Sequence, residues 1–341
     1  MTEMVKVDPI NPSESELERC AKIVKKGGLV VFPTETVYGL GADALNPKAV
    51  LKIFEAKQRP ADNPIIVHIS SSEWLEKLAI EIPEIAWNLA EKAWPGPLTM
   101  VLRKQAIVPD EVTAGLPTVA IRMPAHPVAL KLISLSETPI AAPSANLSGR
   151  PSPTTAEHAI QDLYGRVDII IDAGETIYGV ESTIIDVTKN PPVLLRPGPL
   201  PVERLKELLK ADIVIPKFAR GLKEAEKALA PGTKYRHYAP QTKTVVVETY
   251  DYSKLKSYAE KFLQVVNNLL REGHKIAILI SKETLPFYSV IRGKVKIIVL
   301  GSRQNPYEIA KNLFGSLRSL DELNVDIGII EGFEERGLGL A

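Results

Sequence analysis

Cysteine is nearly absent from this sequence, since Cys20 is the only one in 341 residues. A single cysteine excludes an intrachain disulfide and a cysteine-rich metal site, and it fits a reducing, cytoplasmic setting. Cys20 stands in a helix-like run, where we expect it to be a small core residue. The five histidines are scattered along the chain and predict no metal cluster.

Long apolar runs and an excess of one charge are also missing. No window approaches the roughly 18 apolar residues of a membrane span, and the polar N-terminus lacks the pattern of a signal peptide. Lysine plus arginine number 42 and aspartate plus glutamate 41, so the formal net charge is +1. This balance argues against a protein whose main task is to grip a nucleic-acid backbone. The length and the 45% hydrophobic content predict a globular protein of two domains.

Strand-like and helix-like runs alternate along the chain, which predicts an α/β fold. The strand-like runs of the first 200 residues are Leu29–Phe32, Pro64–Ile69, Leu98–Leu102, Val119–Met123, Ile140–Ala142, Val167–Ile171, Ser182–Val187 and Val193–Leu195. The helices predicted between and after them are Ser15–Lys26, Lys48–Lys57, Ile82–Ala93, Pro127–Leu135, Ala156–Leu163 and Pro201–Leu209.

The pattern changes after residue 210. Residues 211–243 contain a stretch without strand-like runs that ends in a polar and aromatic cluster, and we interpret them as a linker. A second, smaller alternation over residues 244–341 predicts a Rossmann-like α/β domain. Its predicted strands and helices are 244–249, 252–271, 275–280, 294–301, 306–320 and 325–332.

Two glycine-rich segments do not meet the requirements of nucleotide-binding motifs. Gly39 to Ala44 matches G-x-G-x-x-A, but the next helix starts only at Asn46-Pro47, so the segment is not a dinucleotide fingerprint. GETIYGVES has the glycine spacing of a P-loop without its lysine. Phosphate chemistry in this protein must therefore use other groups.

Polar or cationic residues stand at or near the ends of six strand-like runs. Strand alternation places Arg122 on one face with Ala120, and His68 on one face with Ile66. Taken singly, each polar residue has an ordinary explanation as a turn, a cap or a surface position. Taken together, they predict a cleft with four cations and few carboxylates, which suits an anionic ligand. The residues of this predicted cleft are Thr34, Thr36, Lys57, Arg59, His68, Arg122, Ser144, Asn146, Ser182 and Arg196.

The same segments resemble the YrdC-like family. Lys57 to Arg59 is similar to its K-x-R signature, and Ser144 to Asn146 is similar to its S-x-N signature. Further similar segments, in family order, are FPTETVYGLG, RPADNPIIVHI, WPGPLT, TVAIRMPAHP, AAPSAN, GVESTI and LLRPG. The segment KYRHYAP and the trailing domain resemble the long form of threonylcarbamoyl-AMP synthases. The resemblance implies a twisted mixed sheet with helices over residues 1–210, as the catalytic domain, before the linker and the Rossmann-like domain.

The resemblance also implies an activity. Such enzymes make L-threonylcarbamoyl-adenylate from L-threonine, bicarbonate and ATP, and they release pyrophosphate. The product serves t6A formation at position 37 of tRNA, through a partner complex that transfers the threonylcarbamoyl group. Mg²⁺ is expected to be held mainly by the nucleotide, and no membrane is involved. We expect catalysis by positioning and charge, without a protein nucleophile.

The implied roles extend to individual residues. The L-threonine-binding residues are Thr34, Thr36, His68, Arg122, Ala142 and Ser182. The ATP-binding residues are Lys57, Arg59, Asn63, Thr118, Ser144, Asn146, Ser152, Arg196, Lys234, Tyr235 and His237. The catalytic set within them is Lys57, Arg59, Ser144 and Asn146. Residues 216–241 are expected to form a lid over the nucleotide.

Two other functions are compatible with parts of the sequence. One is a tRNA-binding module with a basic concave surface, which the near-neutral charge disfavours as the main role. The other is a hydrogenase-maturation carbamoyltransferase, but the acylphosphatase and zinc-finger modules of those enzymes are absent from this sequence. The sequence ends in EERGLGLA, where the resemblance leads us to expect a further tail containing Asn-Arg.

Overall fold

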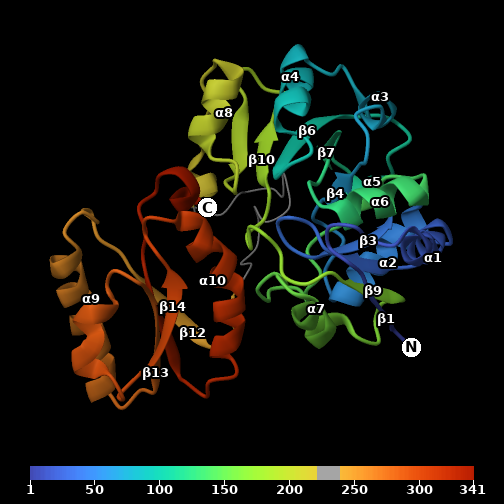
Figure 1. The fold of residues 1–341 in the computed structure, drawn as a ribbon. Coiled ribbons are helices and arrows are strands. Elements are labelled where there is room, and N and C mark those ends of the chain that lie inside the picture. The colour runs from blue at the N-terminus through green and yellow to red at the C-terminus, as the bar shows by residue number, and fades with distance from the viewer. Residues whose placement is uncertain (221–238) are drawn as a thin grey trace.

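The computed structural model of the protein describes residues 1–220 and 239–341, and its strands form two separate sheets (Figure 1). The strands of the larger sheet are β1 (Glu3–Lys6), β2 (Val30–Phe32), β3 (Gly39–Asp43), β4 (Ile66–His68), β5 (Ala79–Ile80), β6 (Leu98–Lys104), β7 (Thr118–Arg122), β8 (Ile140–Ala141), β9 (Ile169–Asp172), β10 (Thr183–Asp186) and β11 (Val193–Arg196). The strands of the smaller sheet are β12 (Lys243–Val247), β13 (Ile276–Ser281), β14 (Lys296–Gly301) and β15 (Ile327–Glu331).

Helices cover both sheets. The helices of the first part of the chain are α1 (Glu14–Lys25), α2 (Pro47–Lys57), α3 (Trp74–Leu78), α4 (Glu84–Ala93), α5 (Asp110–Thr113), α6 (Pro127–Ser136), α7 (Ala156–Leu163) and α8 (Val202–Leu209). Those of the second part are α9 (Leu255–Arg271) and α10 (Pro306–Leu320). Short 3-10 turns lie at η1 (Lys217–Arg220), η2 (Leu285–Ile291) and η3 (Gly337–Leu340).

The larger sheet mixes parallel and antiparallel pairs in the order β1-β9-β2-β3-β8-β4-β7-β6-β10-β11, with β5 paired to β6. The smaller sheet has the order β12-β15-β13-β14, and all its pairs are parallel. This arrangement confirms the predicted α/β class, with a mixed sheet and a small Rossmann-like unit. In the sequence, the predicted linker separates the strands of the larger sheet from those of the smaller one. Its boundaries at residues 211 and 243 stay predictions.

Several short elements escape the sequence pattern. Strand β3 contains the GLGAD segment and pairs antiparallel with β2, so residues 33–38 form the tip of a hairpin. Glycine-rich composition hides this strand, because glycine disfavours strands on propensity alone. The helices α3 and α5 and the strands β1 and β5 are two to five residues long, too short to show a period.

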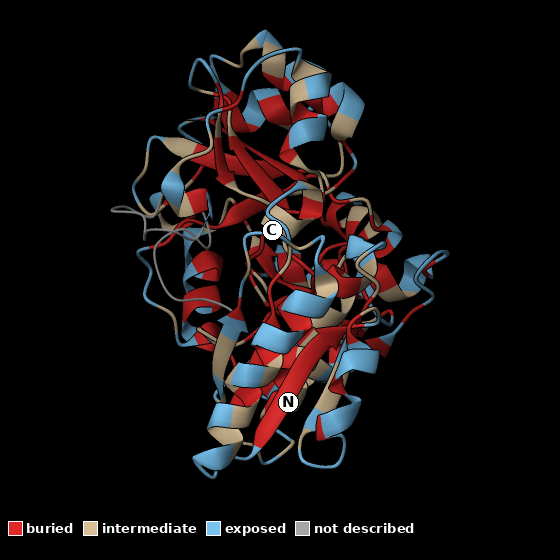
Figure 2. Ribbon diagram, turned by 90° about the vertical axis from the view of Figure 1, so that its left-hand side faces the viewer, coloured by how far each residue is buried: buried red, intermediate tan, exposed pale blue. Residues whose placement is uncertain are grey.

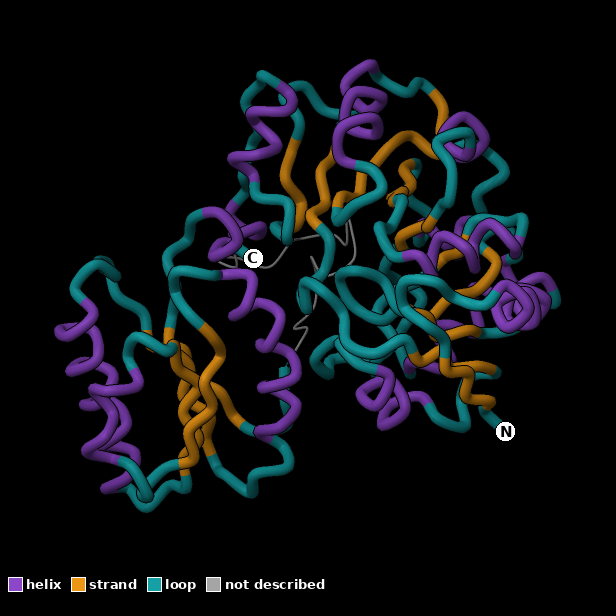
Figure 3. Tube along the Cα trace, viewed as in Figure 1, coloured by secondary structure: helices purple, strands orange, loops and turns teal. Residues whose placement is uncertain are grey.

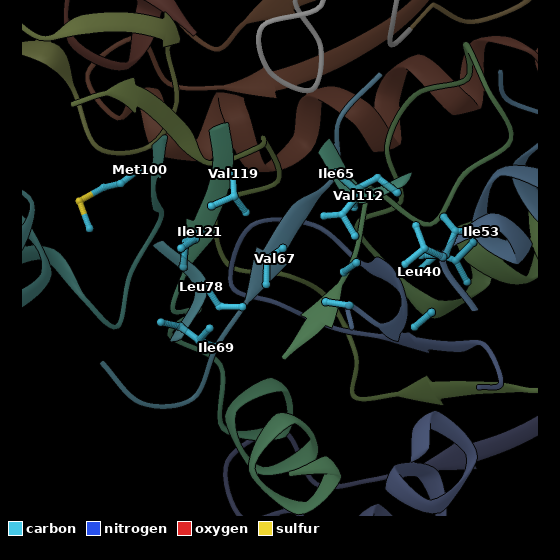
Figure 4. Packing of buried hydrophobic residues seen from close by; sticks show 14 of the residues in the cluster. Leu40, Ile53, Ile65, Val67, Ile69, Leu78, Met100, Val112, Val119 and Ile121 are labelled. Atoms are coloured by element: carbon cyan, nitrogen blue, oxygen red, sulfur yellow. The ribbon is translucent and has the colours of Figure 1, made fainter. Parts of the chain in front are cut away.

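The core of the larger unit confirms the predicted alternation of faces. Ile65, Val67 and Ile69 all pack into one buried cluster with Val119 and Ile121 of the neighbouring strand (Figure 4). Cys20 is fully buried in a second cluster, on the side of α1 and α6, as predicted. The opposite face of β4 and β7 is thereby left to Ile66, His68, Ala120 and Arg122.

The small sheet lies between its two helices, with α9 on the outer face and α10 toward the larger unit (Figures 1 and 3). Its central strands β13 and β15 are mostly buried, whereas the edge strands β12 and β14 are partly exposed and the helices expose their outer surfaces (Figure 2). On the inner side, Phe314 and Leu317 of α10 share one buried cluster with Val37 and Val180 of the larger unit. Helix α10 therefore packs on the small sheet and also contacts the larger unit at Val37 and Val180.

Gly179 lies at a close approach between α10 and the larger unit. Its φ is +73°, and an added Cβ would lie 2.5 Å from both the Cα and the carbonyl oxygen of Lys311. Backbone atoms cannot rotate away, so only glycine fits this position.

We expect Gly179→Ala to destabilise the protein by about 3 kcal/mol or more, because the left-handed backbone and the steric contact both oppose the methyl group. Gly174→Ala is the matched control, since Gly174 has a φ of +82° but nothing within 4 Å of its added Cβ. The control should lose only about 1 kcal/mol. Chemical unfolding followed by circular dichroism measures both values. Equal losses in the two variants would show that α10 does not press on Gly179.

Candidate active-site cleft

One cleft in the larger unit gathers most of the residues predicted from the strand ends. It is a narrow cleft that is partly open to solvent. The predicted residues that line it are Thr34, Thr36, Lys57, Arg59, His68, Arg122, Ala142, Ser144, Asn146, Ser182 and Arg196. Residues distant in sequence thus meet in one concave surface.

Strand register explains this convergence. His68 and Arg122 are direct partners in the parallel pair of β4 and β7. Arg122 is also opposite Thr99 across β7 and β6, and β10 continues the sheet beside β6. Ser182, which precedes β10, therefore lies within 2.8 Å of Thr99, measured between the hydroxyl oxygens.

The remaining predicted residues lie elsewhere. Thr118 begins β7, whereas Arg122 ends it, so about 13 Å of strand separates them and Thr118 does not line the cleft. Asn63 and Ser152 are fully buried behind the lining. The Asn63 carbonyl accepts from Arg59 Nη2 at 3.5 Å, and the Ser152 hydroxyl donates to Glu181. The predicted lid residues Lys234, Tyr235 and His237 fall outside the described residues.

The tip of the β2–β3 hairpin forms a relay of hydroxyl groups. Arg122 Nη1 donates to Thr36 Oγ1 at 2.9 Å. The Thr36 and Thr34 hydroxyl oxygens are 2.8 Å apart, and Thr34 donates to the Val37 carbonyl at 2.6 Å. Because Thr34 uses its proton on Val37 and Arg122 occupies an acceptor position of Thr36, the proton between the threonines belongs to Thr36.

A buried ion pair orients Arg122. Its Nη2 lies 2.6 Å from Glu35 Oε1, and both side chains are at most 4% exposed. The contact is one of charge, because its angles do not meet those of a hydrogen bond and, within the described residues, neither Glu35 oxygen has another partner. Arg122 Nε donates to the Gly96 carbonyl at 3.3 Å. His68 Nδ1, Asn146 Oδ1 and Arg150 Nε, which belong to residues that line the cleft, also lack a hydrogen-bond partner among these residues, as expected where a ligand supplies one.

Burial keeps His68 neutral. Its ring is enclosed by the sheet and meets the Phe32 ring edge-on, with centroids 6.2 Å apart. Desolvation, followed by the neighbouring Arg122 charge, lowers its pKa to about 3. The imidazole is therefore a neutral polar group at physiological pH, with an unpartnered nitrogen near Arg122.

Helix α2 delivers Lys57 to the cleft. Asn46 caps the helix by accepting from the Ala49 amide, and Pro47 starts it, as the sequence predicts. At the other end, Lys57 Nζ donates to the Ser144 carbonyl and, at 2.6 Å, to the Asn146 carbonyl. Desolvation lowers the pKa of this lysine well below its usual range, and Arg59 adds to the effect.

Arg196 and Ser182 form another part of the lining. Arg196 Nη2 donates to Ser182 Oγ at 3.1 Å, and Arg196 Nε donates to the Ser182 carbonyl at 3.0 Å. Two contacts to one residue fix the plane of the guanidinium group.

The cleft is strongly cationic. Besides the four predicted cations it contains Arg150, which the sequence analysis missed because nothing in its own segment sets it apart from other loop arginines. Glu181 is the only carboxylate among the described lining residues.

Across residues 1–220 and 239–341, no group of three or more His, Cys, Asp or Glu side chains could hold a metal ion. In the same ranges, no helix is both long and apolar enough to cross a membrane.

Comparisons with known proteins cover the whole chain. Residues 22–198 match the Sua5/YciO/YrdC family model, described as telomere recombination. Residues 200–341 match the model described as threonylcarbamoyl-AMP synthase, C-terminal domain. Threonylcarbamoyl-AMP synthase from Pyrococcus abyssi is 51% identical over 96% of this chain and 92% of its own length. The Bacillus subtilis protein of the same name is 43% identical over 98% of this chain and 92% of its own length.

Solved structures of related proteins superimpose on this chain. The crystal structure of P. abyssi Sua5 complexed with L-threonine is 49% identical and superimposes with a TM-score of 0.92, over 100% of this chain and 95% of that one. Escherichia coli YciO is 26% identical, with a TM-score of 0.53, over 58% of this chain and 96% of its own.

The buried imidazole predicts a pH dependence of stability. Unfolding returns the pKa of His68 from about 3 to its ordinary value near 6.5, so the unfolded chain binds a proton that the folded protein does not. The stabilisation is fully present above pH 6.5 and is lost as the pH falls toward 3. Between pH 7 and pH 5 this one group should remove about 2 kcal/mol of unfolding free energy. Urea unfolding of His68→Gln at both pH values should show a drop smaller by that amount than in the wild type. An unchanged drop would mean that the pKa of His68 in the folded protein is close to its ordinary value.

Proposed function

The chain belongs to the Sua5/YciO/YrdC family and carries the C-terminal domain of threonylcarbamoyl-AMP synthases, and from this we propose that it joins L-threonine, bicarbonate and ATP into L-threonylcarbamoyl-adenylate with release of pyrophosphate. The observation that carries the proposal is the single cationic cleft in which eleven predicted residues meet: Thr34, Thr36, Lys57, Arg59, His68, Arg122, Ala142, Ser144, Asn146, Ser182 and Arg196. The related P. abyssi Sua5 crystallised in complex with L-threonine, which supports the choice of amino acid.

L-Threonine would bind on the hairpin side. Its carboxylate suits Arg122, which is already aligned by Glu35 and Thr36. The Thr34 and Thr36 hydroxyls, the Ser182 hydroxyl and the neutral His68 offer polar contacts for the amino and hydroxyl groups. Ala142 contributes a small side chain at the end of β8, where a larger one would fill the cleft.

The nucleotide would bind on the side of Lys57 and Arg59. The phosphates of ATP suit these cations and Arg196, and the Ser144 and Asn146 side chains supply further polar groups. A triphosphate beside Lys57 would favour its charged form and offset the desolvation that lowers its pKa. The implied contacts of Asn63, Thr118 and Ser152 stay predictions.

The reaction needs little covalent help from the protein. The threonine amine and bicarbonate give a carbamate and water. An oxygen of the carbamate then attacks the α-phosphorus of ATP while the bond between the α-phosphorus and the bridging oxygen to the β-phosphate breaks, which releases pyrophosphate. Charge then builds on the departing pyrophosphate. Cations that are already oriented stabilise that charge without reorganising, which is the main way such a site accelerates phosphoryl chemistry.

Mg²⁺ fits this cleft only as part of the nucleotide complex. Among the described residues that line the cleft, Glu181 is the one carboxylate, and its Oε1 already accepts a hydrogen bond from Ser152. A protein-held Mg²⁺ prefers one or two carboxylates with water and phosphate oxygens. The metal would therefore be held mainly by ATP and water, and its chemical contribution is to neutralise phosphate charge.

The product would pass to a complex that transfers the threonylcarbamoyl group to tRNA. A carbamoyl-adenylate is a mixed anhydride that water destroys, so transfer to the next enzyme must be prompt. Direct and stable RNA binding is not required by this scheme, in keeping with the net charge of +1.

We expect the purified protein to convert ATP to AMP-linked product and pyrophosphate only when L-threonine and bicarbonate are both present. Pyrophosphate release, followed by a coupled assay, measures this, with omission of each substrate as the control. An RNA-binding module would instead shift tRNA in a gel and show no turnover of ATP. Those two results together would refute the proposed enzymatic activity.

Arg122→Lys should raise the KM for L-threonine by about tenfold or more and change the KM for ATP little, because lysine keeps the charge but loses the two-pronged contact with a carboxylate. Arg103→Lys is the matched control, since Arg103 lies on neighbouring β6, is 59% exposed and pairs with Glu81. Steady-state kinetics with each substrate varied in turn gives both constants. A larger effect on ATP than on L-threonine would place the amino acid elsewhere.

A further inference from the structure

Asp162 is a carboxylate buried between the two parts of the protein. It lies in α7, and its side chain is completely enclosed. Its Oδ2 accepts from the Leu147 amide at 3.1 Å and from Arg318 Nη2 at 2.8 Å. Its Oδ1 accepts from Arg150 Nη1 and, at 3.3 Å, from Arg318 Nη1. A buried charge needs this many partners, because desolvation would otherwise outweigh its interactions.

Arg318 reaches this carboxylate from the other part of the chain. It lies near the end of α10, 156 residues further along the sequence, and its side chain is 3% exposed. The same Nη2 also donates to the Pro151 carbonyl at 2.6 Å. One planar guanidinium group therefore connects α7 and the backbone at Pro151 in a fixed orientation.

The backbone held in this way is a wall of the cleft. Ser144, Asn146, Ser148, Gly149 and Arg150 all line it. The contacts continue inward, because Asn146 Nδ2 donates to the Arg150 carbonyl at 2.9 Å. Lys57 then donates to the Asn146 carbonyl at 2.6 Å, and the Ser148 amide donates to the Lys57 carbonyl at 3.0 Å. An unbroken series of polar contacts thus runs from α10 to Lys57.

We propose that Arg318 is a positioning residue for the nucleotide side of the cleft, so that the trailing domain completes the active site by fixing the wall formed by residues 144–152. The proposal rests on the proposed function, in which that wall binds ATP. Arg318 touches no substrate; it acts through Asp162 and the Pro151 carbonyl. An error of about 1 Å in such a wall is enough to slow a positioned reaction by about a hundredfold.

The alternative is that Arg318 only holds the two parts together. Another ion pair across the same boundary separates the two roles. Lys311, also on α10, lies 2.9 Å from Glu175, and both side chains are about 40–46% exposed. Glu175 lies outside the 144–152 wall and does not line the cleft. Loss of this pair changes a domain contact without reaching the nucleotide side.

Arg318→Lys and Arg318→Ala in the full chain test the proposal. We expect the lysine variant, which keeps a buried charge beside Asp162, to fold and to show a KM for ATP raised about tenfold, with the KM for L-threonine within about twofold of the wild type. Lys311→Met should leave both constants within about twofold. In Arg318→Ala, added guanidinium at millimolar concentration should lower the KM for ATP again, whereas equal sodium chloride should not.

The outcomes separate this proposal from the one on which it rests. No turnover by the wild type refutes the proposed function. Turnover by the wild type with an unchanged KM for ATP in folded Arg318→Lys refutes the role of Arg318 alone. Equal increases in the two KM values, or the same increase in Lys311→Met, would show that Arg318 serves domain docking only. Should Arg318→Ala fail to fold, the lysine variant and the Lys311→Met control decide by themselves.

Discussion

The structure depends on buried carboxylates that stand behind its cationic cleft. Positive side chains that face one hollow repel each other and lose hydration, so each needs support from the protein before any ligand arrives. Glu35 gives it to Arg122, and Asp162 gives it to Arg150 and, across the domain boundary, to Arg318. Glu35 and Asp162 are hidden from the cleft, which therefore stays attractive to anions.

The same arrangement explains why the cleft needs so many backbone contacts. Lys57 is held by two carbonyl groups, and Arg196 is held by the Ser182 carbonyl and hydroxyl. Neutral acceptors orient a cation without cancelling its charge, so it remains available to a phosphate. The loops that offer these carbonyl groups must then be rigid, and the hairpin tip, the 144–152 wall and α10 brace one another for this purpose.

The sequence predicts the long elements and the polar ends of the strands, because both depend on local patterns. Alternation placed Ile66 with His68 and Ala120 with Arg122, and the structure confirms those faces. It could not reveal β3, whose glycines carry no strand signal, or Arg150, whose place in the cleft depends on Asp162 in a later helix. Thr118 shows a further limit, since the face of a strand does not tell which of its two ends meets the cleft.

Contacts between distant segments were the least predictable feature, and they matter most for the trailing domain. Arg318 lies on a helix whose apolar residues predict only that it packs on a sheet. Nothing near it in the sequence indicates a carboxylate 156 positions earlier. Such contacts also have a catalytic consequence, because a reaction catalysed by positioned charges is sensitive to every support of the walls that hold those charges. The trailing domain contributes none of the described residues that line the cleft, and it can still belong to the active site because it fixes the geometry on which the reaction relies.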